Sequence, residues 1–202
     1  MDLKAHAQTD QLKHRLGRCA RLTTPWSGVV YRSASVAYAN RDDILTGAGA
    51  KHAGARWNPP NSVNTVYSSL EIRTAIEESL SQHRYFGFPV ETALPRVIIS
   101  IQANLQRVLD LTDPRPRRAL GLTRGQLLGD DWRACNAGGA EALTQAIGRL
   151  AWEAQWEGLL VPSAADAKGV NLIAFPGNLL SPQSYLLIIN RDQLPAKGMP
   201  VH

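Results

Sequence analysis

Residues 54–80 read GARWNPPNSVNTVYSSLEIRTAIEESL and join three kinds of predicted structure in one short stretch. The stretch begins inside residues 40–62, which are rich in Gly, Pro and Asn and therefore predict a loop. Thr65–Tyr67 predicts a short β-strand. A helix is then expected to run to about His83, with Ser68 or Ser69 as its N-cap. Loop, strand and helix in succession point to a mixed fold.

The predicted helix carries one apolar stripe, and its acidic residues lie off the centre of that stripe. A stripe of this kind packs against the core of a domain. It is formed by Ile72, Ala75, Ile76, Ser79 and Leu80, at positions i, i+3, i+4, i+7 and i+8. The stripe does not select among Glu71, Glu77 and Glu78, and solvent exposure is the default expectation for each of the three.

The remaining chain predicts several short strands and few helices. Residues 1–25 are basic and weakly amphipathic, so we expect a basic N-terminal arm before a domain that covers residues 26–202. Without regular alternation of strand and helix, the order of elements predicts an α+β fold with a small mixed β-sheet core and flanking helices. A further helix is expected over 140–156, and further strands over 29–31, 95–101, 108–111, 158–163, 171–175 and 185–189.

Composition limits the class of protein. A length of 202 residues predicts one domain, with or without an arm, and 44% hydrophobic with 19% charged residues is typical of a globular chain. The N-terminus lacks the apolar segment of a signal peptide, and no apolar run reaches the roughly eighteen residues of a membrane span, so a cytoplasmic protein is expected. Two cysteines and five scattered histidines do not predict a disulfide framework or a metal site.

The net charge of +5 leaves several interpretations open. A basic surface can simply be solvated. It can also attract a phosphate-bearing ligand, an acidic partner or a nucleic acid. Charge alone does not choose among these possibilities.

Some individual side chains suit ligand binding, although each also has a purely structural interpretation. Arg32 follows a predicted strand and Arg56 lies in the Gly-rich loop, and an arginine fork matches phosphate oxygens. Tyr67, at a strand end, can stack on a flat ligand or pack in the core. Ser163 ends an apolar strand without a GxSxG motif, so a serine hydrolase is poorly supported. Neither GxGxxG nor a P-loop motif is present.

An ordered set of motifs resembles the RES domain family. The resemblance covers roughly Gly28 to Pro176, and the order of the motifs is more specific than any one of them. The motifs are VVYR at 29–32, GARWN at 54–58, VYSS at 66–69, AIEESL at 75–80, LDLTD at 109–113, DDW at 130–132, TQAIGRLAWEAQWEGLLVPSA at 144–164 and NLIAFP at 171–176.

The resemblance implies a fold similar to that of ADP-ribosyltransferases and NAD+ as the substrate, with no metal or other cofactor. RES proteins are toxins of bacterial toxin–antitoxin pairs, commonly encoded with an Xre-type helix-turn-helix antitoxin. They deplete NAD+ by hydrolysis or phosphorolysis of the nicotinamide–ribose bond. The resemblance therefore implies a cytoplasmic toxin whose partners are NAD+ and an antitoxin.

Position by position, the resemblance assigns the catalytic residues to Arg32, Glu78 and Ser163. It places the glutamate on Glu78 rather than on Glu77, although the adjacent pair leaves open which carboxylate faces a cleft. Glu78 would stabilise an oxocarbenium-like centre on the ribose, as in glycoside hydrolysis. Ser163 would hydrogen-bond the carboxamide or the ribose. Substrate binding is assigned to Arg56 and Tyr67, with the neighbouring Trp57.

Two alternative functions stay open at this point. The same fold could transfer ADP-ribose to a side chain of a host protein, which would make the chain a mono-ADP-ribosyltransferase. The charge of +5 also permits a non-enzymatic nucleic-acid-binding module. That module is less well supported, because the chain lacks a recognisable DNA-binding motif.

Overall fold

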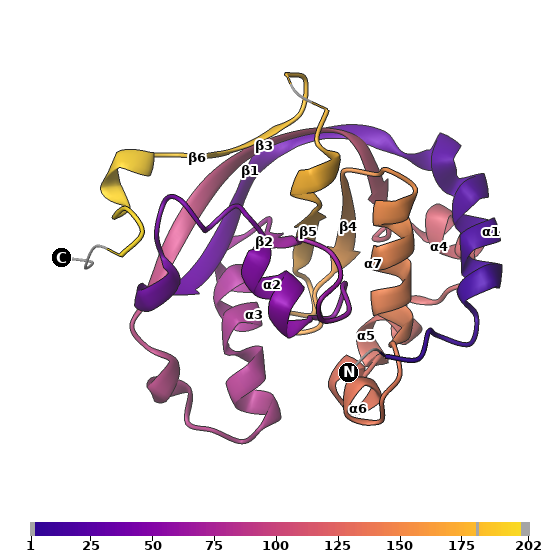
Figure 1. Cartoon of the computed structure of the whole chain (residues 1–202), viewed down its shortest axis with the longest axis horizontal. Helices are drawn as coiled ribbons and strands as arrows, with labels where there is room; N and C mark the ends of the chain where they lie inside the picture. Colours follow the sequence, from indigo (N-terminus) through magenta and orange to yellow (C-terminus); the bar gives the residue numbers. More distant parts are fainter. Residues whose placement is uncertain (1–2, 181, 199–202) are drawn as a thin grey trace.

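The computed structural model describes residues 3–180 and 182–198 (Figure 1). It confirms the predicted α+β class, with one six-stranded mixed sheet and flanking helices. The strands are β1 (Thr24–Ser35), β2 (Val66–Ser69), β3 (Arg96–Asp110), β4 (Gly158–Pro162), β5 (Val170–Ala174) and β6 (Tyr185–Ile188). The α-helices are α1 (Thr9–Cys19), α2 (Ala48–Ala53), α3 (Ile72–Tyr85), α4 (Pro114–Leu120), α5 (Arg124–Gly129), α6 (Trp132–Ala137) and α7 (Leu143–Glu153).

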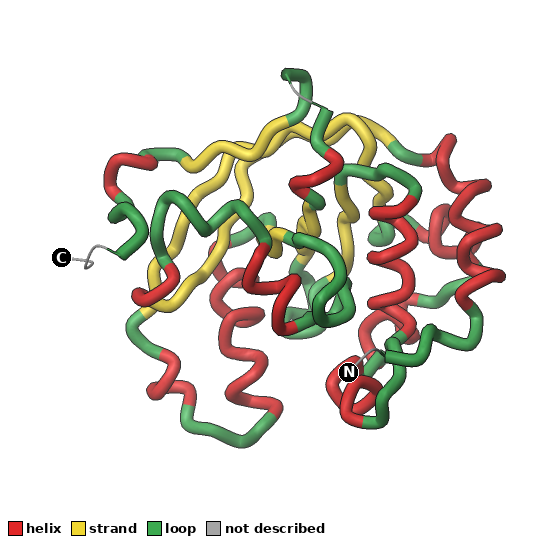
Figure 2. The backbone as a smooth tube through the Cα atoms, viewed as in Figure 1, coloured by secondary structure: helices red, strands yellow, loops and turns green. Residues whose placement is uncertain are grey.

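The sheet has the strand order β1-β2-β5-β4-β3-β6, and β1 also pairs with β3. The strands β1, β2, β5, β4 and β3 therefore pair in a closed ring, with β6 added at the edge of β3. The β3–β4 pair is parallel and the other pairs are antiparallel. Figure 2 shows the helices on two flanks of the strands, with α3 on one flank and α1, α4 and α7 on the other. This ring brings the ends of β1, β2 and β5 close to α3.

Several predicted elements differ in extent from those observed. The strands expected over 95–101 and 108–111 are parts of the single long strand β3, and the expected loop 40–62 contains α2. The cap prediction is wrong, because Ser68 and Ser69 are buried in β2 and Glu71 is the N-cap of α3. Ser69 instead pairs across the sheet, opposite Tyr31 on one side and Asn171 on the other.

The apolar stripe of α3 is also only partly buried. Ala75 and Leu80 are buried as expected, whereas Ile72 and Ile76 are exposed. Thr74 is buried in their place, and its hydroxyl donates to Asp166 at 2.8 Å. The helix is therefore rotated about its axis relative to the prediction, which turns the face that carries Glu78 toward the sheet.

The N-terminal segment packs on the domain, in contrast to the arm expected over residues 1–25. Helix α1 lies against α4 and α7, and its Leu12, Leu16 and Cys19 are buried in the main core cluster. The predicted boundary also falls inside β1, which begins at Thr24. The segment was expected to be an arm because its many charged residues mask a narrow apolar face of Leu12, Leu16 and Cys19.

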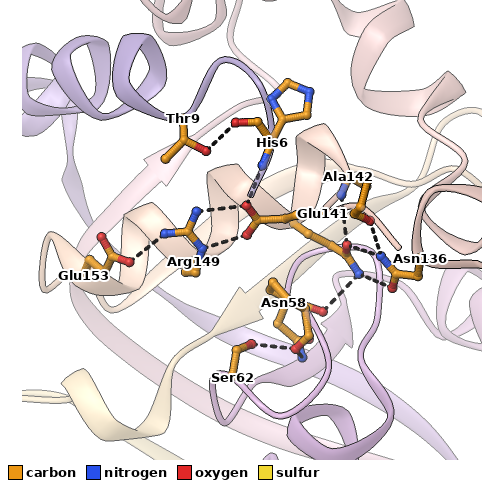
Figure 3. Close-up of polar contacts among 12 residues, drawn as sticks. His6, Thr9, Asn58, Ser62, Asn136, Glu141, Ala142, Arg149 and Glu153 are labelled. Atoms are coloured by element: carbon orange, nitrogen blue, oxygen red, sulfur yellow. Dashed lines mark hydrogen bonds and ion pairs between the residues drawn. The ribbon is translucent and has the colours of Figure 1, made fainter. Parts of the chain in front are cut away.

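Polar contacts fix the chain just before α1 to the start of α7. Backbone hydrogen bonds join Lys4 to Gly139 and to Glu141 at 2.9 and 2.8 Å. The Glu141 carboxylate accepts from the backbone N–H of His6 and from the guanidinium of Arg149, which also pairs with Glu153 (Figure 3). Because Glu141 is buried, this paired carboxylate holds the N-terminal segment against the domain.

The GARWN loop is fixed by close packing against α7. The ring of Trp57 belongs to the main core cluster, and a Cβ atom at Gly148 would overlap the backbone oxygen of Trp57. Gln145 Nε2 donates to the backbone oxygens of Ala55 and Asn58 at 3.0 and 3.3 Å. The loop that carries Arg56 is thus held rigidly. None of the helices in the described ranges is long and apolar enough to cross a membrane.

Candidate active site

A cleft of about 690 Å³ opens between α3 and α6, below the ends of β1, β2 and β5. Figure 1 shows α3 and α6 on opposite sides of this region. The cleft is lined by the residues that the resemblance assigns, with the exception of the buried Ser163, and by others that the sequence did not single out. Those on which the site depends are Arg32, Arg56, Tyr67, Glu78, Arg133 and Asn171.

Glu78 lies on α3 with one carboxylate oxygen held by the protein. Its Oε1 accepts from Ser163 Oγ at 2.6 Å and from Asn171 Nδ2 at 2.7 Å. Its Oε2 has no hydrogen-bond partner among the residues that the structure describes. Two donors on one oxygen fix the orientation of the carboxylate, and the second oxygen remains available to a ligand in the cleft.

Ser163 is oriented by its own loop so that its proton points at Glu78. Its Oγ accepts from the backbone N–H groups of Ala165 and Asp166, at 3.1 and 2.9 Å, and donates to Glu78. The residue is only 1% exposed. The direct contact with a ligand that the resemblance implies for Ser163 stays a prediction. In this structure its hydroxyl contacts Glu78, and both its donor and its acceptor capacity are in use.

Asn171 is a member of this network that the sequence analysis missed. Its Nδ2 donates to Glu78, and its Oδ1 accepts from Ser69 Oγ at 2.7 Å. Ser69 and Asn171 are direct partners across the antiparallel pair β2–β5. A polar residue that opens an otherwise apolar strand is the sequence signal that could have marked Asn171.

Glu77 points away from the cleft, which answers the choice between the two adjacent glutamates. Its carboxylate pairs with Arg84 at 2.5 Å, and it lines a separate shallow hollow beside Thr74 and Lys168. Successive residues of a helix differ by about 100° in direction. Glu78 alone of the pair lines the cleft.

Arg32 projects from β1 into the cleft and has an unused buried donor. Its Nη1 is buried and makes no hydrogen bond within the described part of the chain. Burial lowers the pKa of the Arg32 guanidinium, and Tyr67 opposes that shift. A guanidinium still keeps its charge at neutral pH. An unsatisfied buried donor is costly, so its retention at this position favours an anionic ligand as its partner.

Tyr67 has its ring at the cleft and its hydroxyl fixed in the wall. The hydroxyl accepts from Trp57 N at 2.9 Å and donates to Asn58 Oδ1 at 2.8 Å. Burial raises the pKa of Tyr67 far above its usual value, so the hydroxyl stays protonated. Trp57 borders the cleft, but with 2% exposure its side chain serves the core. Of these two rings, that of Tyr67 is the more exposed to the cleft.

Arg56 lines the cleft while one of its nitrogens is bound to the protein. Nη1 donates to the backbone oxygens of Leu127, Leu128 and Asp130 at 3.1, 3.4 and 2.9 Å. These oxygens lie at the end of α5, where a cation is favoured. Arg56 is thus anchored through one nitrogen, and its charge still contributes to the potential of the cleft.

The mouth of the cleft is formed by a stack of three side chains. The guanidinium of Arg133 lies 4.4 Å from the ring centroid of Trp132 and 4.8 Å from that of Tyr85. The Tyr85 hydroxyl donates to Asp131 Oδ2 at 3.0 Å. This stack links the end of α3 to α6, two segments far apart in the sequence. The sequence analysis missed it, and the DDW motif at 130–132 was its only signal.

The arrangement combines one oriented carboxylate with several arginines in a single cleft. The arginines favour a ligand that carries phosphate, and the carboxylate can stabilise positive charge that develops on the bound ligand. The side chains of residues 3–180 and 182–198 include no cluster of three or more His, Cys, Asp or Glu residues that could hold a metal ion.

Comparison with known proteins identifies the family. The model of the RES domain matches residues 29–185, which include every residue of the cleft named above. The chain belongs to the RES domain family. The resemblance drawn from the ordered motifs is thereby confirmed.

Characterised relatives and a solved structure agree with this assignment. The NAD(+) phosphorylase MbcT of Mycobacterium tuberculosis is 34% identical over 156 residues, covering 76% of this chain and 75% of MbcT, and the protein of the same name from Mycobacterium bovis matches equally. The crystal structure of the M. tuberculosis MbcT–MbcA toxin–antitoxin complex superposes with a TM-score of 0.68 at 28% identity, covering 90% of each chain.

Proposed function

We propose that this protein degrades NAD+ by cleaving its nicotinamide–ribose bond, as the toxin of a bacterial toxin–antitoxin pair. The observation that carries the proposal is Glu78, held by Ser163 and Asn171 through one carboxylate oxygen. Among the described residues, its second oxygen and the buried Nη1 of Arg32 in the same cleft have no hydrogen-bond partner. Membership of the RES domain family and likeness to an NAD(+) phosphorylase support it.

The chemistry needs a stabilised positive centre on the ribose. As the glycosidic bond breaks, its electron pair leaves with nicotinamide, which becomes neutral, and positive charge develops at the anomeric carbon. The free oxygen of Glu78 stabilises that charge and accepts a hydrogen bond from a ribose hydroxyl. Ser163 and Asn171 hold the carboxylate in place, so both are positioning residues.

The cleft walls bind the groups on either side of the nicotinamide ribose, which are the diphosphate and the nicotinamide ring. Arg32, with its free buried nitrogen, and Arg56 supply positive charge for the diphosphate of NAD+. The ring of Tyr67 stacks on the nicotinamide, and its fixed hydroxyl keeps the ring in one orientation. Held in this way, the ribose lies against Glu78 before the bond breaks.

The acceptor is inorganic phosphate. An oxygen of phosphate attacks the anomeric carbon, and the products are nicotinamide and ADP-ribose that carries phosphate on that carbon. The relative named NAD(+) phosphorylase supports phosphate over water. Labelling of a protein would instead indicate transfer of ADP-ribose to a side chain.

A protein partner keeps the enzyme inactive in the cytoplasm of its host. An enzyme that consumes NAD+ would otherwise stop the growth of the cell that makes it. Likeness to the toxin in a toxin–antitoxin complex supports such a partner. The partner that we propose is an Xre-type helix-turn-helix antitoxin encoded beside the toxin, and contact with nucleic acid would occur only through that antitoxin.

Expression in bacteria tests this function. The chain alone is expected to lower cellular NAD+ and to arrest growth, and co-expression of the neighbouring helix-turn-helix protein is expected to restore both. The Glu78→Gln variant serves as the matched control, because it keeps side-chain volume and removes the charge. Normal growth with unchanged NAD+, in cells that contain folded protein, would contradict the proposal.

A further inference from the structure

The stack at the mouth of the cleft holds the guanidinium of Arg133 against two aromatic rings. Its central carbon lies over the ring of Trp132 at 4.4 Å from the centroid and over the ring of Tyr85 at 4.8 Å. Tyr85 is itself held by its hydrogen bond to Asp131. Stacking of this kind fixes the plane of a guanidinium without using any of its N–H groups.

The N–H groups of this guanidinium have no acceptor in the described part of the chain. The side chain of Arg133 makes no hydrogen bond and no ion pair with any residue in the ranges 3–180 and 182–198. Two other cleft arginines have such partners, since Arg84 pairs with Glu77 and Arg56 donates to three backbone oxygens. Arg133 is thus a cation packed against two rings with an open, planar donor fork, and such a fork matches two oxygens of a phosphate.

Groups of both signs surround Arg133. Partial burial lowers the pKa of Arg133, and the positive charge of Arg56 acts in the same direction, while Tyr85, Asp131 and Glu78 act against it. Arg133 therefore lies within electrostatic reach of both Arg56 and the proposed catalytic carboxylate. An anion between the two arginines would remove their mutual repulsion.

We propose that Arg133 binds the diphosphate of the dinucleotide from the α6 wall of the cleft, opposite Arg32 on β1. This inference rests on the proposed function, because it takes NAD+ as the ligand. In NAD+ the diphosphate is one ribose away from the bond to be broken. Arg133 accordingly holds the ADP half of the molecule while Glu78 faces the nicotinamide ribose. The guanidinium of Arg133 is oriented toward the diphosphate by three positioning residues, Tyr85, Trp132 and Asp131.

Calorimetric titration with ADP-ribose tests the subsite without requiring turnover. ADP-ribose carries the diphosphate and lacks nicotinamide, so it can occupy the subsite without being cleaved. Arg133→Gln, which keeps a planar group and loses the charge, is expected to weaken ADP-ribose binding about tenfold to a hundredfold. Arg133→Lys keeps the charge without the planar fork. Its affinity for ADP-ribose is expected to lie between those of Arg133→Gln and the parent. The matched control is Arg118→Gln, on the exposed face of α4, which should bind like the parent.

Steady-state kinetics separate the diphosphate from the acceptor phosphate. Arg133→Gln should raise KM for NAD+ and leave KM for inorganic phosphate unchanged, with thermal melting used to show that the variant is folded. Unchanged ADP-ribose affinity in a folded Arg133→Gln variant, or a rise confined to KM for phosphate, would overturn the assignment. A parent protein that does not bind ADP-ribose would overturn it as well. NAD+ consumption by the parent, measured separately, tests the proposed function, so the two failures are distinguishable.

Discussion

The floor and the mouth of the cleft differ in how completely the protein satisfies its own polar groups. At the floor, a continuous hydrogen-bond network ends on one oxygen of Glu78. It includes the side chains of Ser69, Asn171 and Ser163 and two backbone N–H groups. At the mouth, the side chain of Arg133 contacts the rings of Trp132 and Tyr85, and its N–H donors are unused by the described protein. The hydrogen bonds at the floor are therefore formed before a ligand binds. The donors at the mouth are left for a bound ligand to satisfy.

This difference separates two kinds of contribution to activity. A group that is fixed in advance and aimed at developing charge lowers the barrier of the chemical step. A group that gains its partner only on binding contributes mainly to affinity. Changes at the floor should thus lower kcat, and changes on the walls and at the mouth should raise KM.

The largest expected effect is at Glu78. Glu78→Gln should lower kcat about a hundredfold or more, because the amide keeps the volume but cannot stabilise positive charge on the ribose. Release of nicotinamide from NAD+ by the purified variant measures this loss. Glu77→Gln, which changes the neighbouring glutamate outside the cleft, is the control and should retain the parent rate. Full activity of Glu78→Gln together with loss in Glu77→Gln would show that the wrong carboxylate has been assigned.

A smaller effect is expected on the wall at Arg32. Arg32→Ala removes the buried donor that has no partner among the described residues. It should raise KM for NAD+ about tenfold to a hundredfold, with a smaller change in kcat. Initial rates over a range of NAD+ concentrations give KM and kcat separately. Arg118→Ala removes the same charge from an exposed site on α4 and should have no effect. Equal effects of the two substitutions would mean that positive charge acts diffusely, without a specific clamp.

Ser163 distinguishes a positioning residue from one that touches the substrate. Ser163→Ala removes one of the two donors to Glu78 Oε1, and kcat should fall about tenfold while KM for NAD+ stays near the parent value. The conservative variant Ser163→Thr should recover part of kcat, since it restores the hydroxyl. An effect confined to KM would instead indicate direct contact between this hydroxyl and the substrate.

The smallest effect is expected at the rim of the mouth. Tyr85→Phe removes the exposed hydrogen bond to Asp131 and leaves the ring stacked on Arg133, so KM for NAD+ should change by no more than about twofold. Tyr85→Ala removes the ring as well and should have the larger effect on KM. Identical values for the two variants would show that the ring does not orient Arg133.

The sequence predicted the parts of the fold and site that depend on local pattern. The apolar runs at 158–163 and 171–175 indicated β4 and β5, and the ordered motifs indicated Arg32 and Glu78. The short helices α4, α5 and α6 were missed, because six or seven residues carry too little periodicity to identify a helix.

Contacts between distant segments could not be predicted from one sequence. Asn171 reaches Glu78 only because β5 pairs with β2, and a register shift of one residue would turn its side chain to the other face. The role of Arg133 depends on Tyr85 from the end of α3. The burial of α1 depends on α4 and α7, whose positions follow from the whole fold.

Product analysis tests the central claim most directly. Purified protein is incubated with NAD+ in the presence and in the absence of inorganic phosphate, and the products are identified by ³¹P NMR and mass spectrometry. With phosphate present, we expect nicotinamide and ADP-ribose phosphorylated on its anomeric carbon, and the Glu78→Gln variant should form neither. Intact NAD+ after incubation with folded parent protein, under both conditions, would contradict the claim that this cleft breaks the nicotinamide–ribose bond.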